Sequence, residues 1–369
     1  MKELITIAAL LAAVLMSSSV VAGDEPSRQS NSADQLTIAV FGDWPYHQRL
    51  LDSARLLIDS VNSDRKVKLV LHVGDIHSGS MACTGAGLSP LPPGSVPSWN
   101  EGIYNLFEQF NDPFVYTPGD NEWTDCHKKK ELSSGAPLNE LASVRALFFP
   151  NPGTTLGGYK KSVQTQAREF DHKHPVDAQF VENVMWKQNH VVFVTLNMPG
   201  SNNDGLPWTA PFANEPARIA EAAQRTLADL RWLDAAFDRA EEDGAKAVLI
   251  GLQANMWDPE ALLAGGDGLS NYTLFVHELA QRSLHFHRPV LLINGDSHVF
   301  GVDQPLADPA SVTGLIHNAP AVPNLTRITV QGSTTTPAEW LRLTIDTRSA
   351  QVFSWENVAY CKDPLITCQ

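Results

Sequence analysis

The sequence predicts an α/β fold, in which a largely parallel β-sheet is covered by helices and an antiparallel portion lies near the C-terminus. Two patterns carry this prediction. From about residue 36 to residue 293, short apolar runs typical of buried strands alternate with stretches of helical periodicity. Three further β-rich runs then follow one another towards the end of the chain.

In the first half, helices are expected at residues 48–61, where apolar side chains recur on one face, and at residues 99–110. Residues 78–98 are rich in Gly, Ser and Pro, and a stretch of that length without structure is usually functional or disordered. Short apolar runs predict strands at residues 36–41, 67–73 and 114–116.

In the second half, residues 180–185 and 191–196 predict paired strands around a turn at residues 187–189. A long amphipathic helix is expected at residues 215–243, with Gly244 as its C-terminal cap. The remaining predicted elements are strands at 247–251 and 290–293, a helix near 274–284, and β-rich runs at 326–330, 340–345 and 351–355.

The N-terminal residues have the order of a secretory signal peptide. Lys2 precedes an apolar run at residues 4–16, and small residues up to Ala22 follow it, so we expect cleavage after Ala22. The apolar run is shorter than the roughly 20 residues that a membrane span needs. We therefore expect export to the periplasm or the extracellular space, with residues 23–35 forming a flexible leader.

Four predicted strands end in Gly-Asp, at Asp43, Asp75, Asp120 and Asp296, and a fifth is followed by the amide of Gln253. Ligands of such sheets bind outside the carboxyl ends of the strands, so we expect these side chains to converge. Crowded carboxylates raise one another's pKa unless cations neutralise them. The signatures therefore predict a dinuclear metal site.

The ordered series of signatures resembles the calcineurin-like metallophosphoesterase superfamily, which includes the purple acid phosphatases, as a divergent member. The resemblance extends over about residues 35–355. It implies a two-layer β-sandwich of mixed sheets flanked by helices, and a metallophosphoesterase domain at residues 36–357 followed by a tail at 358–369. It also implies that a metal-bound hydroxide attacks a small phosphorylated substrate in line.

The resemblance assigns ligands to two divalent cations. One would bind Asp43, Asp75 and His298, while the other would bind Asp75, Asp120 or Asn121, Gln253 and Asp296. The second set is rich in oxygen, which suits Mg²⁺, Mn²⁺ or Ca²⁺, with Fe or Zn at the first position. The alternative is that one position has lost its metal.

Four family histidines are replaced in this chain, at Pro45, Asn121, Gln253 and Asp296, and two of the replacements bear on the first metal and on catalysis. The first-signature histidine is absent, so Tyr46, His47 or His77 is left to complete the first metal. Asn121 stands where the family has the catalytic histidine that assists the leaving group. Because an amide gives no proton, His77 or His127 is a candidate replacement in catalysis.

In an exported chain, the four cysteines favour disulfides over metal ligation. They allow three pairings. We favour Cys361–Cys368, which closes a short loop, and Cys83–Cys126, because both of these loops should leave the same edge of the sheet. The formal net charge of −14 argues against nucleic acid bound through its phosphates, although metal cations can reverse the field locally.

Two other functions are weighed against this hydrolase. Gly295-Asp296-Ser297 resembles the Gly-Asp-Ser signature of lipase-like esterases, but that signature belongs near the start of the chain, and no Gly-x-Ser-x-Gly elbow occurs. The stronger alternative is a catalytically degenerate metal-binding or ligand-binding protein on the same fold. The retained acids argue against it, because clustered buried charge is costly.

Overall fold

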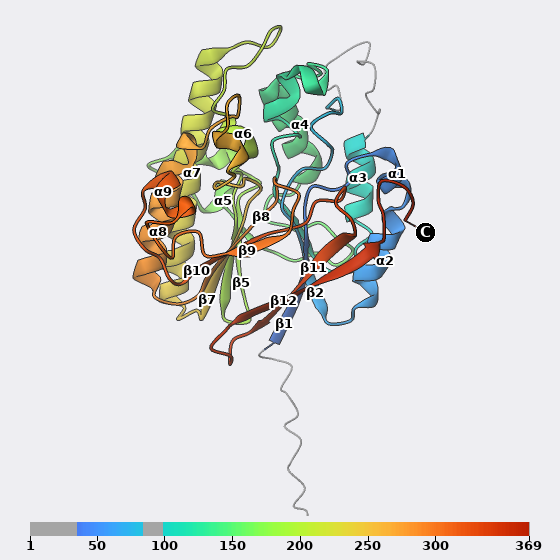
Figure 1. Cartoon of the computed structure of the whole chain (residues 1–369). Helices are drawn as coiled ribbons and strands as arrows, with labels where there is room; N and C mark the ends of the chain where they lie inside the picture. Colours follow the sequence, from blue (N-terminus) through green and yellow to red (C-terminus); the bar gives the residue numbers. More distant parts are fainter. Residues whose placement is uncertain (1–34, 84–98, 369) are drawn as a thin grey trace, which may run out of the picture. The chain divides into compact units, whose positions relative to one another are not determined.

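The computed structural model of the protein describes residues 35–83 and 99–368, and its strands form two mixed sheets (Figure 1). The predicted signal peptide, nearly all of the predicted leader and the segment 84–98 lie outside the described residues. Within the part of the chain that the structure describes, no helix is long and apolar enough to cross a membrane.

The first sheet has five strands. Its neighbours β1, β2 and β3 are parallel, while β11 pairs antiparallel with β1 and with β12. In spatial order the strands are β12 (Phe353–Cys361), β11 (Ala338–Asp346), β1 (Gln35–Phe41), β2 (Val67–His72) and β3 (Phe114–Tyr116).

The second sheet has seven strands, of which β6, β7, β8 and β10 are parallel and the outer strands antiparallel. In spatial order they are β4 (Gln164–Thr165), β5 (Val184–Gln188), β6 (Val191–Thr195), β7 (Ala247–Gly251), β8 (Val290–Asn294), β10 (Leu325–Thr329) and β9 (Gly301–Asp303).

The two sheets pack face to face around one apolar core. Ile38 of β1 and Leu71 of β2 share this core with Phe193 of β6 and Leu249 of β7, and all four side chains are buried. Alternate residues of the same strands, such as Val248, point instead towards the helices. The sandwich implied by the family resemblance is confirmed. The strand pattern alone suggested one largely parallel sheet, because periodicity identifies strands but not their partners.

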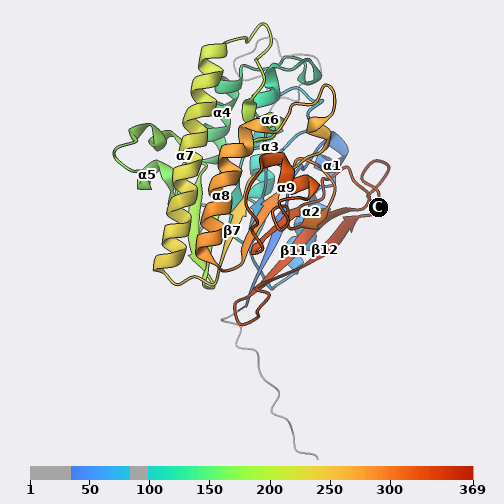
Figure 2. The same ribbon diagram turned by 60° about the vertical axis from the view of Figure 1, so that its left-hand side comes forward.

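Helices cover both outer faces of the sandwich (Figures 1 and 2). The five-stranded sheet packs against α2 (Ala54–Ser63), α3 (Trp99–Phe107) and α4 (Pro137–Phe148), and the seven-stranded sheet against α7 (Glu215–Glu242) and α8 (Thr273–Phe286). Shorter helices are α1 (Gln48–Asp52), α5 (Gln166–Glu169), α6 (Gly200–Asp204) and α9 (Val312–His317). Short 3₁₀ turns are η2 (Thr124–His127), η3 (Lys129–Glu131), η4 (Pro175–Gln179), η5 (Glu260–Leu262) and η6 (Ser270–Tyr272).

Several predicted boundaries are wrong for local reasons. The predicted helix at 48–61 is two helices, broken at Ser53. The predicted strand at 180–185 begins only at Val184, because residues 175–179 form η4 and a turn follows it. β5 also continues to Gln188, so the turn begins only at Asn189: Asn189 and His190 form a two-residue hairpin loop with φ of 52° and 57°.

The C-terminal strand differs as well. β12 starts at Phe353 and continues to Cys361, so the predicted domain end at residue 357 falls inside this strand. The predicted cap of α7 is confirmed, because Gly244 has a φ of 61° and donates its N–H to the Glu241 carbonyl at 3.1 Å.

Candidate functional site

The structure brings the strand-end aspartates together in a strained backbone conformation. Asp43 follows β1, Asp75 follows β2 and Asp296 follows β8, and their φ angles are 48°, 59° and 74°. Left-handed backbone is costly for a residue with a side chain and is found preferentially at functional sites. The backbone of Gly119 also packs closely against the Asp75 carboxylate, because a Cβ added at Gly119 would lie 2.0 Å from Asp75 Oδ1. The strand ends thus direct the buried carboxylates of Asp43 and Asp75 towards each other, while the backbone N–H of the half-buried Asp296 contacts Asp43.

The hydroxyl of Tyr46 contacts two of these aspartates and His298. The hydroxyl oxygen lies 2.8 Å from Asp43 Oδ1, 2.8 Å from Asp75 Oδ2 and 3.0 Å from His298 Nε2. A hydroxyl carries one hydrogen, so it can donate to only one carboxylate at a time. The other short contact therefore needs a second proton, shared between a carboxyl and the phenol oxygen.

The pKa shifts in the cluster favour the protonated forms of its groups. Burial, together with the nearby charge of Asp120, raises the pKa of Asp75 and of Asp296 well above the usual range of a carboxyl. Burial lowers the pKa of His298, but the hydrogen bond and charge of Asp43 outweigh it and raise the value to about 9. A bound cation would displace these protons, because metal ligands must be deprotonated.

A second group of side chains surrounds Asp120. Ser201 donates its hydroxyl to Asp120 Oδ2 at 2.7 Å, and Ser201 Oγ also lies 2.8 Å from Asp125 Oδ1. Lys128 and Lys130 each approach Asp125 to 2.8 Å. This group was not predicted from the sequence, although Lys128 and Lys130 lie only eight and ten residues after Asp120. They place positive charge beside an otherwise acidic site.

Ser201 reaches Asp120 because residues 201–204, which make up most of α6, form a left-handed turn rather than a regular α-helix. The four residues have φ values of 52°, 54°, 58° and 60°, where a single left-handed residue costs roughly 1–2 kcal/mol. Side-chain bonds hold the turn: Arg225 donates to Asn203 Oδ1, and Trp208 Nε1 donates to Asp204 Oδ1 at 2.9 Å. Asn202, Asn203 and Asp204 are residue types that tolerate left-handed backbone, so the sequence indicates a turn here, but its position against Asp120 depends on α7 and a following loop.

The other predicted residues lie in different roles. Asn121 Nδ2 donates to Asp75 Oδ2 at 2.9 Å and to the His77 carbonyl at 3.0 Å, so it orients the aspartate. His47 caps α1 through Nδ1. Burial lowers the pKa of both His77 and His127 to about 4, so each is neutral at pH 7 and a poor proton donor.

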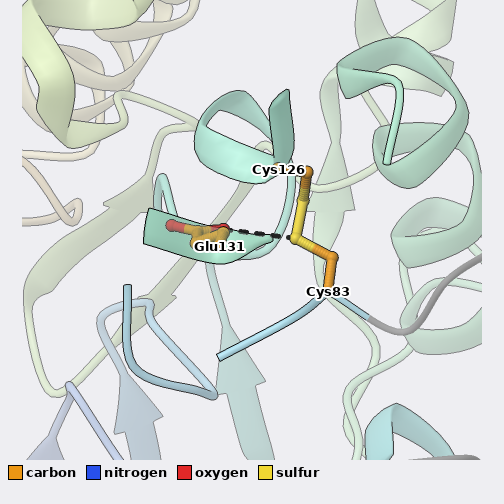
Figure 3. A group of neighbouring side chains, drawn as sticks. All are labelled: Cys83, Cys126 and Glu131. Carbon is orange, nitrogen blue, oxygen red and sulfur yellow. Dashed lines mark hydrogen bonds between the residues drawn. A yellow bond between two sulfur atoms is a disulfide. The ribbon is translucent and has the colours of Figure 1, made fainter. Parts of the chain in front are cut away.

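A disulfide joins the loops that follow β2 and β3 (Figure 3). The sulfur atoms of Cys83 and Cys126 lie 3.4 Å and 3.7 Å from the carbonyl oxygen of Asn121. Glu131 Oε2 lies 3.3 Å from Cys83 Sγ, but the paired sulfurs leave no thiolate for a metal. Both predicted pairings are confirmed, the second being Cys361–Cys368.

The family model for calcineurin-like phosphoesterases matches residues 36–300, which include every strand-end signature described above. The chain belongs to the calcineurin-like phosphoesterase family. No curated protein sequence matches it. Among solved structures, one titled "GAP50 the anchor in the inner membrane complex of Plasmodium" is similar over 89% of this chain and 90% of that chain, with a TM-score of 0.42 and 10% identity.

Membership of the calcineurin-like phosphoesterases implies metal-dependent hydrolysis of phosphoesters with divalent cations. The first predicted position fits such an ion. Asp43, Asp75 and His298 donor atoms lie 2.8–3.0 Å from Tyr46 Oη, and His298 Nε2 lies 3.3 Å from Asp43 Oδ1. Ligands about 2.1 Å from an octahedral ion lie about 3.0 Å from their neighbours. The four measured pairs therefore have roughly the spacing of adjacent metal ligands, and ligand atoms of Asp43, Asp75 and His298 all lie within 4.8 Å of one another.

The second predicted position fits a cation poorly. Gln253 directs its Nε2, not its oxygen, to Asp120 Oδ1 at 3.0 Å and to Asp75 Oδ2 at 3.3 Å. Asp296 Oδ2 accepts the Asn255 N–H at 2.8 Å. An amide nitrogen that carries two hydrogens is a donor and cannot ligate a metal. One of the ligands that the resemblance predicts thus presents hydrogens to the site.

Proposed function

We propose that this chain is an exported, metal-dependent hydrolase of phosphate esters whose cation is held by Asp43, Asp75, His298 and Tyr46. The observation that carries the proposal is the closeness of these groups: Tyr46 Oη lies 2.8–3.0 Å from the other three, and ligand atoms of Asp43, Asp75 and His298 lie within 4.8 Å of one another. Export to the periplasm or the extracellular space rests on the predicted signal peptide, and the two disulfides are compatible with an oxidising compartment.

Protein groups hold the proposed ligands in place. A divalent cation bound there supplies a Lewis acid and lowers the pKa of a water molecule. Asp43 accepts the Asp296 N–H at 3.2 Å, and Asp75 accepts the Asn121 N–H at 3.2 Å. Glu122 accepts the Ile76 N–H at 3.1 Å and the Gly119 N–H at 3.1 Å, so it ties the ends of β2 and β3 together. Such fixed donors limit reorganisation during reaction.

The proposed binding site for the substrate is a cavity of about 250 Å³, which is lined in part by Asp120, Asp296 and Lys130. The Lys130 side chain is 50% exposed, so its ammonium group can reach a phosphate oxygen while it remains paired with Asp125. This positive charge offsets the acidic surroundings locally. The size of the cavity favours a small phosphorylated substrate.

Asn121 offers no proton to the leaving oxygen, and His77 is held neutral by burial. We therefore expect good leaving groups, such as aryl oxides, to react much faster than alkyl oxides of the same phosphate class. This expectation separates the chain from family members that keep a histidine at the position of Asn121.

The test compares the wild type with Asp75→Asn on 4-nitrophenyl phosphate and bis-4-nitrophenyl phosphate, with Mg²⁺, Mn²⁺, Ca²⁺, Zn²⁺ or Fe²⁺ added to chelator-treated protein. We expect metal-dependent turnover that falls at least about 100-fold in Asp75→Asn. Asp59→Asn, whose side chain is 63% exposed, is the matched control and should keep full activity. Equal background rates in all three proteins would favour the alternative, a metal-binding or ligand-binding protein on the same fold.

A further inference from the structure

The amide of Gln253 has only one orientation that satisfies its neighbours. Its Oε1 accepts the backbone N–H of Gly200, while Nε2 donates to Asp120 Oδ1 and Asp75 Oδ2. A reversed amide would place its NH₂ group against the Gly200 N–H and its oxygen against two carboxylates. Donor would then face donor, and acceptor would face acceptor. Because Gln253 is fully buried, water cannot relieve that mismatch.

Gln253 therefore makes the link that a bridging cation would otherwise make. Asp120 and Asp75 follow different strands, and both carboxylates accept hydrogens from the same nitrogen at 3.0 Å and 3.3 Å. Two hydrogens on Nε2 can serve both acceptors at once. The amide holds the two acids at a fixed separation without placing a further full charge between them.

The second carboxylate oxygen of Asp120, Oδ2, is bonded by Ser201, which directly follows Gly200 in the chain. Ser201 donates to Asp120 Oδ2 at 2.7 Å, and Lys128 Nζ lies 2.9 Å from Ser201 Oγ. Gly200 and Ser201 thus supply consecutive contacts, one to Gln253 and one to Asp120. Lys128 is paired with Asp125 as well, so a protein cation compensates this end of the acidic cluster.

We propose that the site binds one divalent cation per chain, at Asp43, Asp75, His298 and Tyr46, and that the Gln253 amide takes the place of the second cation of the family. The inference revises the dinuclear site predicted from the sequence. It rests on the proposed function in one respect only: the proposed function supplies the four residues that hold the remaining ion.

The experiment counts metal ions and their magnetic coupling, which are independent of turnover. Protein loaded with Mn²⁺ and dialysed against metal-free buffer is measured by inductively coupled plasma mass spectrometry and by electron paramagnetic resonance. The wild type should retain one Mn²⁺ per chain with an uncoupled six-line spectrum. Gln253→Glu should retain two with a coupled spectrum, because one carboxylate oxygen can accept the Gly200 N–H while the other joins Asp75 and Asp120.

Gln109→Glu, on the exposed surface, is the matched control and should retain one ion. Two coupled ions in the wild type, or no retained ion, would overturn the inference. So would a folded Gln253→Glu, verified by circular dichroism, that still retains one. If Gln253→Glu does not fold, the count and spectrum of the wild type decide. One retained ion without hydrolysis of 4-nitrophenyl phosphate would instead refute the proposed function and leave the stoichiometry standing.

Discussion

The hydroxyl of Tyr46 lies 3.0 Å from Nε2 of His298, although 252 residues separate the two in the sequence. Their rings meet edge to face, with centroids 5.0 Å apart. This contact joins the loop after β1 to the loop after β8, and therefore one sheet of the sandwich to the other. The proposed metal site lies where the two sheets meet.

Replacing Tyr46 with Phe should weaken binding of Mn²⁺ by at least about tenfold, because the change removes the oxygen that contacts Asp43, Asp75 and His298. Isothermal titration calorimetry on chelator-treated protein gives the dissociation constant. Tyr159→Phe is the matched control, since Tyr159 is 68% exposed, and its affinity should equal that of the wild type. Unchanged affinity in Tyr46→Phe would remove Tyr46 from the set of ligands.

Gly200→Ala should lower phosphoesterase activity at least about tenfold and destabilise the fold by about 1–3 kcal/mol. An added Cβ would lie 2.9 Å from Asp120 Oδ2 and 2.9 Å from Asp296 Oδ1, so both carboxylates would have to move. Steady-state kinetics and urea unfolding measure the two effects. Wild-type activity in this variant would show that the position of the two carboxylates is not needed for turnover.

Gly102→Ala provides the control for a glycine-to-alanine change as such. Gly102 lies inside α3, and an added Cβ there would meet no atom within 4 Å. The substitution should stabilise the protein by about 0.5–1 kcal/mol and leave activity unchanged, because alanine loses less backbone entropy than glycine on folding.

The two disulfides should differ in their effects. Cys83–Cys126 spans 43 residues and Cys361–Cys368 spans 7, so loop entropy predicts losses of about 4 kcal/mol and about 2 kcal/mol when each pair is replaced by serines. Only the first replacement should also lower activity, because its sulfurs pack against the Asn121 carbonyl. Urea unfolding and turnover of 4-nitrophenyl phosphate test both points. A similar loss of activity in both variants would mean that the first disulfide has no specific role at the site.

His72 should make the fold sensitive to acid. It is fully buried in β2, with Nδ1 accepting the Gly74 N–H and Nε2 near the Trp44 carbonyl, and burial lowers its pKa from 6.5 to about 4. Below pH 6.5, His72 is therefore protonated in the unfolded chain but stays neutral in the folded protein. The contribution of His72 to stability should be complete above pH 6.5 and fall by about 3 kcal/mol as the pH approaches 4.

The pH dependence of the urea midpoint measures this loss. His72→Phe lowers stability at every pH, because it leaves the Gly74 N–H without its acceptor, but it should flatten the slope between pH 6.5 and pH 4. An equally steep slope in His72→Phe would assign the acid sensitivity to other groups.

Much of the fold could be predicted because strands and helices leave local patterns. The runs of β1, β2, β3, β7 and β8 are short and apolar, and each was located within one or two residues. The pairing Cys83–Cys126 could be predicted as well, since both cysteines follow strand ends at one edge of the sheet. Pairing partners could not be predicted from such patterns: β11 lies beside β1 although some 300 residues separate them.

The sequence by itself determined that aspartates follow the ends of several buried strands, because Gly-Asp after an apolar run is a local signal. Only the tertiary structure decided what surrounds those aspartates. Gly200, brought in by a left-handed turn that α7 supports, sets the orientation of the Gln253 amide. Whether a side chain offers oxygen or hydrogen to a site depends on contacts from distant segments, and these contacts leave no periodic trace in the sequence.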